Sequence, residues 1–351
     1  MHLPEGFPVA PQLAKAVDAV PEAAGLGYEP KWDGFRAIAY VDGTDASGER
    51  VVLDSRGAKP LTRYFPELVA EFSRQLSVPV VLDGEIVVRQ GVRGGERLDW
   101  EALSQRIHPA ESRIARLAAE TPAAFVAFDL LYLDGRSLLG EPFETRRAAL
   151  ELLFGGLEAP LHMTQLTRDA ALARRWLEEF EGAGLDGVVA KPLGLAYAPN
   201  KRVMFKTKHK RTADVVALGY RIHKSGSGVG SLLVGLYDAD GELRNVGGVS
   251  AFSDARRQSL VDELAPLVVR DDSGDAVTGE TERSRFSAGK DVSFVRLRPE
   301  RVLEVRYDQM EGSRFRHTVQ FERWRPDRDA RSCGYDQLER PVAYDLGEVL
   351  A

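Results

Sequence analysis

The sequence predicts an α+β domain built on antiparallel sheets, followed by a small β-barrel. From about residue 26, short apolar segments typical of strands are interrupted by helical patterns, without the regular alternation of a parallel α/β fold. After Thr212 the pattern changes to alternating apolar and polar residues, which is typical of strands with one solvated face. The chain has 351 residues, more than one core of ordinary size holds, so we expect two domains.

In the first domain, each expected strand is a short apolar segment next to turn residues. The expected strands are residues 26–32, 36–43, 51–57, 78–88 and 123–135. Helices are expected where apolar residues recur at a spacing of three and four. These segments are residues 63–76, 100–107, 144–154 and 168–184. The last one ends on glycine, which commonly follows a helix C-terminus.

The second domain is expected to be a barrel of about five strands with one helix. Its expected strands are residues 214–222, 302–310 and 317–325, together with a hairpin over 231–249 that turns at YDADGEL. The expected helix covers residues 254–268. This content suits an OB-fold barrel, which often handles nucleic acid. We place the boundary near residues 209–213, giving domains 1–210 and 211–351.

Composition excludes several classes of protein. A hydrophobic content of 44% and a charged content of 28% are ordinary for a soluble globular protein. No apolar run of about 18 residues occurs, and the N-terminus has no basic region leading into an apolar one. We therefore expect a cytoplasmic protein with no membrane partner. The single cysteine, Cys333, excludes an internal disulfide, and the six histidines lack metal-ligand spacing, so a structural zinc site is not expected.

Charge is distributed unevenly along the chain. The formal net charge is −6, yet residues 201–224 contain eight Lys and Arg and one Asp, and residues 283–328 contain 12 Lys and Arg against 7 Asp and Glu. Such segments commonly form solvated faces. Here they give a basic C-terminal half, which is compatible with a polyanionic partner.

A series of short motifs carries most of the functional information. KWDGFR contains Lys31 ahead of an Asp-Gly turn. The motifs that follow it in order are LDSRGAK with Arg56, LDGEIVV with Glu85, AFDLLYLDG with Phe128, LDGVVAKP with Asp186 and Lys191, MFKTKHK with Lys206 and Lys208, and FERWRPDR with Arg323, Arg325, Asp327 and Arg328. Taken singly, each has an ordinary structural explanation: a strand-end acid, a core aromatic, or the outward face of a strand. Their joint occurrence in one order favours a shared site.

This ordered series resembles the nucleotidyltransferase motifs of ATP-dependent DNA ligases, which share a superfamily with RNA ligases and mRNA capping enzymes. KWDGFR is similar to the family's KxDGxR, whose lysine becomes covalently adenylated. The resemblance extends from Glu29 to Arg328. The WRPDR ending and the compact length most resemble the stand-alone bacterial ligase C type and the ligase domain of bacterial ligase D. The first domain is then expected to be a nucleotidyltransferase, or adenylation, domain.

The resemblance implies a catalytic centre that works on ATP. Lys31 would attack the α-phosphate, giving a lysyl-AMP and releasing pyrophosphate. Lys206 and Lys208 would hold the phosphates and favour the free-amine form of the nucleophile. Glu85 and Asp186 would contact Mg²⁺, with Mn²⁺ as a substitute, because Mg²⁺ binds through one or two carboxylates together with substrate phosphates. In the family, the residue matching Glu85 alternatively meets the ribose.

The resemblance also assigns the walls of the nucleotide pocket. Phe128 would stack on one face of the adenine and Val189 would pack on the other. Glu29 would accept a hydrogen bond from the adenine amino group. Arg36 and Lys191 would complete the pocket.

Three further arginines have implied roles, and two positions depart from the family pattern. Arg56 would take the 5′-phosphate of a nick. Arg323 and Arg325 would orient the pyrophosphate during self-adenylation, which requires the barrel to close over ATP. The family's counterpart of LDGVVAKP usually has glutamate where this chain has Asp186, and the last motif usually ends in lysine, where it has Arg328. Both residues keep the charge of the family's residue.

The partner implied by the resemblance is nicked duplex DNA, sealed in DNA repair by a monomeric bacterial enzyme that is nucleoid-associated while on DNA. A repair polymerase or an end-binding protein is the expected protein partner. An RNA ligase or another lysyl-NMP nucleotidyltransferase would use the same lysine. A non-catalytic OB-fold binder needs only a basic groove and aromatics. A P-loop ATPase is disfavoured, because KSGSGVGSLLVG lacks GxxxxGK[ST].

Overall fold

The computed structural model describes residues 6–42, 50–92, 94–281, 292–339 and 341–350. The chain forms two compact units: one contains residues 1–208 and 341–351, and the other contains residues 209–340. Each unit is described by itself. The expected strand over 36–43 and the basic segment 283–328 fall partly outside the described residues. No helix in the described ranges is long and apolar enough to cross a membrane.

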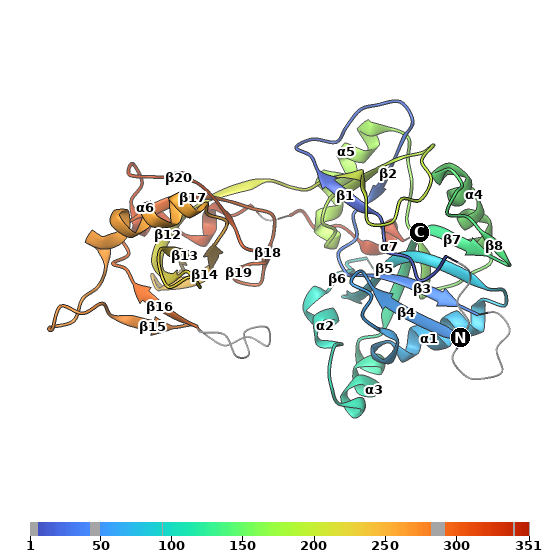
Figure 1. Ribbon diagram of the computed structural model, residues 1–351, viewed down its shortest axis with the longest axis horizontal. Helices are drawn as coiled ribbons and strands as arrows, with labels where there is room; N and C mark the ends of the chain where they lie inside the picture. Colours follow the sequence, from blue (N-terminus) through green and yellow to red (C-terminus); the bar gives the residue numbers. More distant parts are fainter. Residues whose placement is uncertain (1–5, 43–49, 93, 282–291, 340, 351) are drawn as a thin grey trace. The chain divides into compact units, whose positions relative to one another are not determined.

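The first unit contains two sheets (Figure 1). The smaller sheet has the strand order β1-β11-β10-β2, with β1 Leu13–Ala16, β11 Arg202–Thr207, β10 Val188–Pro192 and β2 Leu26–Pro30. The larger sheet has the order β4-β3-β5-β7-β8, with β6 pairing with β5 and β9 with β7. The strands of this larger sheet are β4 Val51–Ser55, β3 Phe35–Val41, β5 Val80–Gln90, β7 Ala123–Leu133, β8 Arg136–Ser137, β6 Arg97–Leu98 and β9 Leu161–Met163.

Helices and short 3₁₀ turns connect and cover these sheets. They are η1 Thr62–Tyr64, α1 Pro66–Gln75, α2 Trp100–Gln105, α3 Glu111–Glu120, α4 Phe143–Phe154, α5 Ala170–Glu179, η2 Phe180–Ala183 and α7 Leu346–Val349. The helix expected over 63–76 is divided because Pro66 begins a new helix at N1, where its missing N–H costs nothing. The helix expected over 168–184 ends earlier, and η2 closes at Gly184, which has a φ of 89°.

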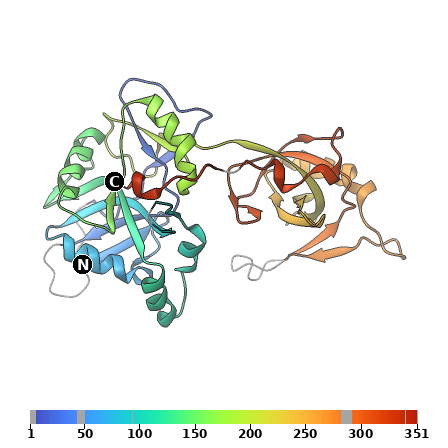
Figure 2. The same ribbon diagram turned by 180° about the vertical axis from the view of Figure 1, so that it is seen from behind.

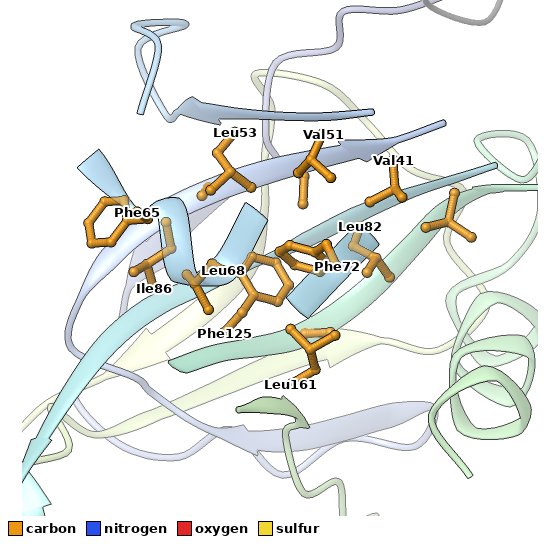
Figure 3. Packing of buried hydrophobic residues seen from close by; sticks show 14 of the residues in the cluster. Val41, Val51, Leu53, Phe65, Leu68, Phe72, Leu82, Ile86, Phe125 and Leu161 are labelled. Atoms are coloured by element: carbon orange, nitrogen blue, oxygen red, sulfur yellow. The ribbon is translucent and has the colours of Figure 1, made fainter. Parts of the chain in front are cut away.

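Strand β7 lies between two hydrophobic cores. Its alternate residues face opposite sides of the sheet. Phe125 and Ala127 pack with helix α1 in one core (Figure 3), whereas Ala124 and Val126 pack in a second core with the smaller sheet and α5. Because both faces are covered, the strand is an almost continuous apolar run rather than an alternating one.

The last described residues, 341–350, belong to the first unit, which corrects the expectation that 211–351 form one barrel domain. Leu346 and Val349 are fully buried in the second core of that unit. The Leu346 N–H donates to the Glu96 carbonyl at 2.8 Å, and the Tyr344 ring lies 5.0 Å from that of Phe180. Figure 2 shows α7, in red, among the elements of this unit. The chain therefore leaves the unit after β11 and returns to it.

The second unit is built on antiparallel strands with one α-helix in its described part. Strand β12 pairs with β13, β16 and β17, and β17 pairs with β20. Its elements are β12 Arg211–Ile222, β13 Val229–Tyr237, β14 Leu243–Val249, α6 Asp254–Leu264, η3 Ala265–Leu267, β15 Thr278–Glu280, β16 Ser293–Arg296, β17 Val302–Tyr307, β18 Met310–Glu311, β19 Arg314–Phe315, β20 Gln320–Trp324, η5 Ala330–Ser332 and η6 Tyr335–Gln337. The polar connector expected at 209–213 is shorter, because residues 211–213 already pair with β17.

Candidate active site

A cavity of about 540 Å³ in the first unit contains most of the predicted site residues. This volume suits a small-molecule ligand. Nine of the predicted residues line it: Glu29, Lys31, Arg36, Arg56, Glu85, Phe128, Val189, Lys191 and Lys206. They come from both sheets, so the two sheets together make one pocket.

Lys31 follows strand β2 and forms hydrogen bonds with the LDGVVAKP motif. Its N–H donates to the Gly187 carbonyl at 2.8 Å, and its carbonyl accepts from the Asp186 N–H at 2.9 Å. The Lys31 Nζ lies 2.5 Å from Asp186 Oδ2, and the Lys208 Nζ lies 2.8 Å from the same oxygen. Asp186 Oδ1 is buried and has no hydrogen-bond partner among the residues that the structure describes. The predicted nucleophile therefore shares one carboxylate with a second lysine.

Two glycines next to these residues allow neighbouring backbone segments to pack closely. Gly187 has a φ of 137°, and a Cβ there would lie 2.1 Å from the Thr207 carbonyl oxygen. A Cβ on Gly34 would lie 2.1 Å from the Ile86 carbonyl oxygen. Both glycines follow an aspartate, so the Asp-Gly pairs provide backbone contact as well as a turn.

Glu85 and Arg36 stand side by side on paired strands β5 and β3. Arg36 donates two hydrogen bonds to Asp83, at 2.8 and 2.7 Å, and Tyr197 donates a third to the same acid at 2.7 Å. Glu85 Oε1 accepts from the Gly34 N–H at 3.2 Å. Burial raises the pKa of Glu85 to about 7, although Lys31 and Arg36 act in the opposite direction. This carboxyl group is poised to change its charge near neutral pH.

The aromatic wall of the cavity is held by cations. Arg36 Cζ and Lys191 Nζ each lie 4.8 Å from the centre of the Phe128 ring. Lys191 Nζ also donates to the Phe128 carbonyl at 3.1 Å and lies 2.6 Å from Glu29 Oε2. Within the described part of the chain, Glu29 Oε1 is buried and has no hydrogen-bond partner. An acceptor oxygen is therefore available close to the aromatic ring.

Val189 lies between two other predicted site residues on the smaller sheet. On the smaller sheet it lies opposite Glu29 of β2 and opposite Lys206 of β11. Burial lowers the pKa of Lys206, and the neighbouring charges of Lys31 and Lys208 lower it further. A phosphate would relieve this repulsion among the lysines.

Arg323 and Arg325 belong to the second unit and have acidic partners there. Arg323 Nε lies 2.6 Å from Glu304 Oε2. Arg325 lies 3.0 Å from Asp214 and 2.8 Å from Asp327, and its hydrogen bonds lower the pKa of Asp327 to about 2. Both arginines are therefore held in ion pairs on the barrel.

Comparison with known families identifies this arrangement. Residues 11–208 match the model of the ATP dependent DNA ligase domain, and residues 225–328 match that of the ATP dependent DNA ligase C terminal region. The chain belongs to the family of ATP-dependent DNA ligases. The resemblance inferred from the motifs is thereby confirmed, together with the fold class, the enzyme class and the dependence on ATP.

Curated relatives agree with this assignment. DNA ligase C of Mycobacterium tuberculosis is 54% identical in an alignment of 365 positions, gaps included, which covers 100% of this chain and 99% of that protein. The LigD repair protein of the same species, described as a multifunctional non-homologous end joining protein, is 33% identical over 86% of this chain and 36% of its own length. Among solved structures, a Lig E DNA ligase described as binding DNA with a minimal scaffold has a TM-score of 0.56 at 17% identity, covering 90% of this chain and 99% of that one. This last likeness concerns the fold alone.

Three residues that line the cavity or contact its lining residues have no role among the predictions. Gln12 lines the cavity, and its N–H donates to the Tyr197 hydroxyl at 3.2 Å. Arg147 on α4 is buried, with Nη1 3.8 Å from Glu29 Oε1. Asp83 was part of a quoted motif, but only its bond to Arg36 shows its task. For Arg147 the only available signal was a pair of adjacent arginines in a helix otherwise rich in apolar residues.

Proposed function

We propose that the cavity binds ATP and transfers its AMP to Lys31 Nζ. In this step the N–P bond to the α-phosphorus forms, the bond to the pyrophosphate oxygen breaks, and pyrophosphate leaves. The observation that supports it most directly is Lys31 at the shared carboxylate of Asp186, inside a pocket that also contains Phe128 and Glu29. Phe128 and Val189 would enclose the adenine, and Glu29 Oε1 would accept from its amino group.

The chain's own residues account for the charges of this reaction. Lys206 and Lys208 would contact the phosphates, with Arg36 and Lys191 completing the pocket. Asp186 would release Lys31 and Lys208 as phosphates take over the lysine contacts. Catalysis of phosphoryl transfer depends chiefly on in-line positioning and charge stabilisation, which these groups can provide.

The carboxylates of the pocket suit a divalent cation. Asp186 Oδ1 is buried and has no hydrogen-bond partner among the described residues, and burial raises the pKa of Glu85 to about 7. A hard cation would therefore stabilise the charged form of both carboxyl groups. We propose that Asp186 and Glu85 hold Mg²⁺, or Mn²⁺ in its place. When bound, this ion would supply charge stabilisation at the transferring phosphate.

We further propose that the adenylated enzyme seals nicked duplex DNA in repair. Arg56 would take the 5′-phosphate of the nick, onto which AMP passes from Lys31. The 3′-hydroxyl would then form the phosphodiester bond and AMP would leave. Arg323 and Arg325 would serve only the first step. The setting proposed for this monomeric enzyme is the bacterial cytoplasm, on the nucleoid, beside a repair polymerase or an end-binding protein.

Intact mass tests the central step. Incubation with ATP and Mg²⁺ should add one AMP through an acid-labile bond, and Lys31→Arg should abolish the adduct, because a guanidinium stays protonated. Lys15→Arg, at an exposed lysine of strand β1, is the matched control and should keep the adduct. An unchanged adduct on Lys31→Arg would refute the assignment of the nucleophile.

A further inference from the structure

Arg147 occupies an unusual position beside the nucleotide pocket. It lies on α4 with a side chain only 8% exposed, and its Nε donates to the exposed Glu151 at 2.7 Å. Its Nη1 points to Glu29 Oε1 at 3.8 Å, a distance too long for a hydrogen bond. Both Nη1 and Oε1 are buried, and neither has a hydrogen-bond partner in the described ranges of the chain. Two complementary groups thus face each other without using their hydrogen-bonding capacity.

The preceding arginine shows what a purely structural partner looks like. Arg146 binds Asp129 through two hydrogen bonds, at 2.7 and 2.8 Å, and also donates to the Glu141 carbonyl at 2.6 Å. That pair satisfies both charges completely. Around Glu29, by contrast, Lys191 occupies Oε2 at 2.6 Å while Oε1 remains open.

We propose that Arg147 is a positioning residue that makes the enzyme choose ATP over GTP, by keeping Glu29 a charged acceptor with one oxygen open. This inference rests on the proposed contact of Glu29 with the adenine. Arg147 supplies positive charge close to Oε1 without occupying it, so the oxygen stays available to the base.

The chemistry of the two purines explains the selection. Adenine carries an amino donor where guanine carries a carbonyl acceptor. A charged carboxylate accepts from the first and repels the second. A protonated carboxyl group can donate its O–H to guanine, so loss of the charge would remove the barrier to GTP. Discrimination of this kind is strong because a mismatched base leaves buried polar groups unpaired.

The electrostatic surroundings make this charge depend on its neighbours. Burial raises the pKa of Glu29, while Lys191 on β10 and Arg147 on α4 lower it and the nearby acid Asp129 on β7 raises it. Asp129 is itself paired with Arg146. Removing Arg147 therefore shifts the pKa of Glu29 upward, and protonation reaches Glu29 at a higher pH than in the native protein.

The test compares kcat/KM for formation of the Lys31 adduct with ATP and with GTP, at about pH 8 and about pH 6. The variants are Arg147→Met, Arg147→Lys, Glu29→Gln and the double variant Arg147→Met with Glu29→Gln. Glu151→Gln, which removes the negative charge of the exposed partner of Arg147, is the matched control. Thermal unfolding of each variant establishes that it is folded.

We expect Arg147→Met to lower the preference for ATP, measured as the ratio of the two kcat/KM values, at least about tenfold, the scale of losing one partner of a buried charge pair, and to lower it more at the lower pH. Arg147→Lys should restore most of it, Glu151→Gln should keep it, and the double variant should be no worse than Glu29→Gln. The inference would be overturned if Arg147→Met lowered kcat/KM equally for ATP and GTP. It would also be overturned if the change in the ATP preference were the same at both pH values. An unchanged preference in Glu29→Gln would instead overturn the adenine contact, and absence of any adduct on the native protein would overturn the proposed function.

Discussion

The two units of this ligase hold their functional charges in different ways. In the first unit, Lys31 lines a cavity and shares Asp186 with Lys208, and one oxygen of that acid has no hydrogen bond from any described residue. In the second unit, Arg323 and Arg325 are each held by local carboxylates at the barrel surface. In both units the cations would have to leave acidic partners to bind a phosphate as proposed, but Lys31 already lines a cavity with Phe128 and Glu29, whereas Arg323 and Arg325 are held on the barrel. The first unit should therefore carry out the chemistry of every step. The arginines of the second unit should contribute only to the reaction with ATP.

The largest expected effect is at Asp186. Asp186→Asn removes one negative charge with little change in shape, and sealing of a pre-adenylated nick should fall about 10²–10³-fold, as when an electrostatic stabiliser of a transition state is lost. ATP binding should fall much less, because Phe128 and Lys191 remain. Single-turnover sealing at saturating Mg²⁺ measures the effect.

Two controls separate this role from that of a turn residue. Asn supports an Asp-Gly type of turn as well as Asp does, so a nearly native rate in Asp186→Asn would mean that Asp186 only shapes the chain before Gly187. Asp186→Glu restores the family's usual residue and should retain substantial activity. Equal losses in both variants would show that size, not charge, matters at this position.

A smaller and more selective effect is expected at Arg325. Arg325→Gln should slow adduct formation with ATP roughly tenfold to a hundredfold, the scale of one or two strong charge-assisted contacts. Sealing of a pre-adenylated nick should stay close to native, because the proposed role ends when pyrophosphate leaves. Rates of the two half-reactions, measured on the same preparation, test this split.

Arg306→Gln is the matched control for Arg325, since Arg306 lies on the same barrel, also paired with an acid, and has no proposed part in the reaction. It should change neither half-reaction. Arg325 also anchors Asp214 within the barrel. If Arg325→Gln lowered the rates of both half-reactions and also the thermal stability, the role of Arg325 would be structural. The proposed difference between the functional charges of the two units would then be wrong.

The convergence of the site could be predicted from sequence because its residues follow the strands of two sheets. Glu29 precedes the first motif, Val189 and Lys206 belong to two others, and cross-strand register brings the three into one row. The proposed roles of these residues came from the family resemblance of the ordered motifs, because each residue type taken singly also has an ordinary structural explanation. Motif order could therefore predict which residues line the cavity.

Other features depend on contacts between distant segments that leave no local pattern. Nothing in the helix expected over 144–154 distinguishes Arg147, which lies next to Glu29, from Arg146, which pairs with Asp129. The return of residues 341–350 to the first unit was likewise missed, because α7 has only four residues and no periodicity to detect. Its position arises from packing in a core whose other members are far away in the sequence.

That returning segment changes how the units can be separated. A chain cut after residue 212 loses the barrel and also loses Leu346 and Val349 from the core of the first unit. Inactivity of such a fragment would then reflect unfolding as much as the absence of Arg325. The more informative variant replaces residues 209–340 by a flexible Gly/Ser linker and keeps 341–351 in place.

Leu346→Ala tests this boundary with a stability measurement. Leu346 is fully buried, so its truncation should lower the free energy of unfolding of the first unit by about 2–4 kcal/mol, the usual cost of a buried leucine. Val342→Ala in the same segment is the matched control, because the Val342 side chain is 85% exposed, and it should change stability by less than about 0.5 kcal/mol. Denaturant unfolding of the linker variant carrying each substitution isolates the first unit. Equal stability of the two variants would mean that residues 341–350 do not complete the core, and that the first unit ends at residue 208.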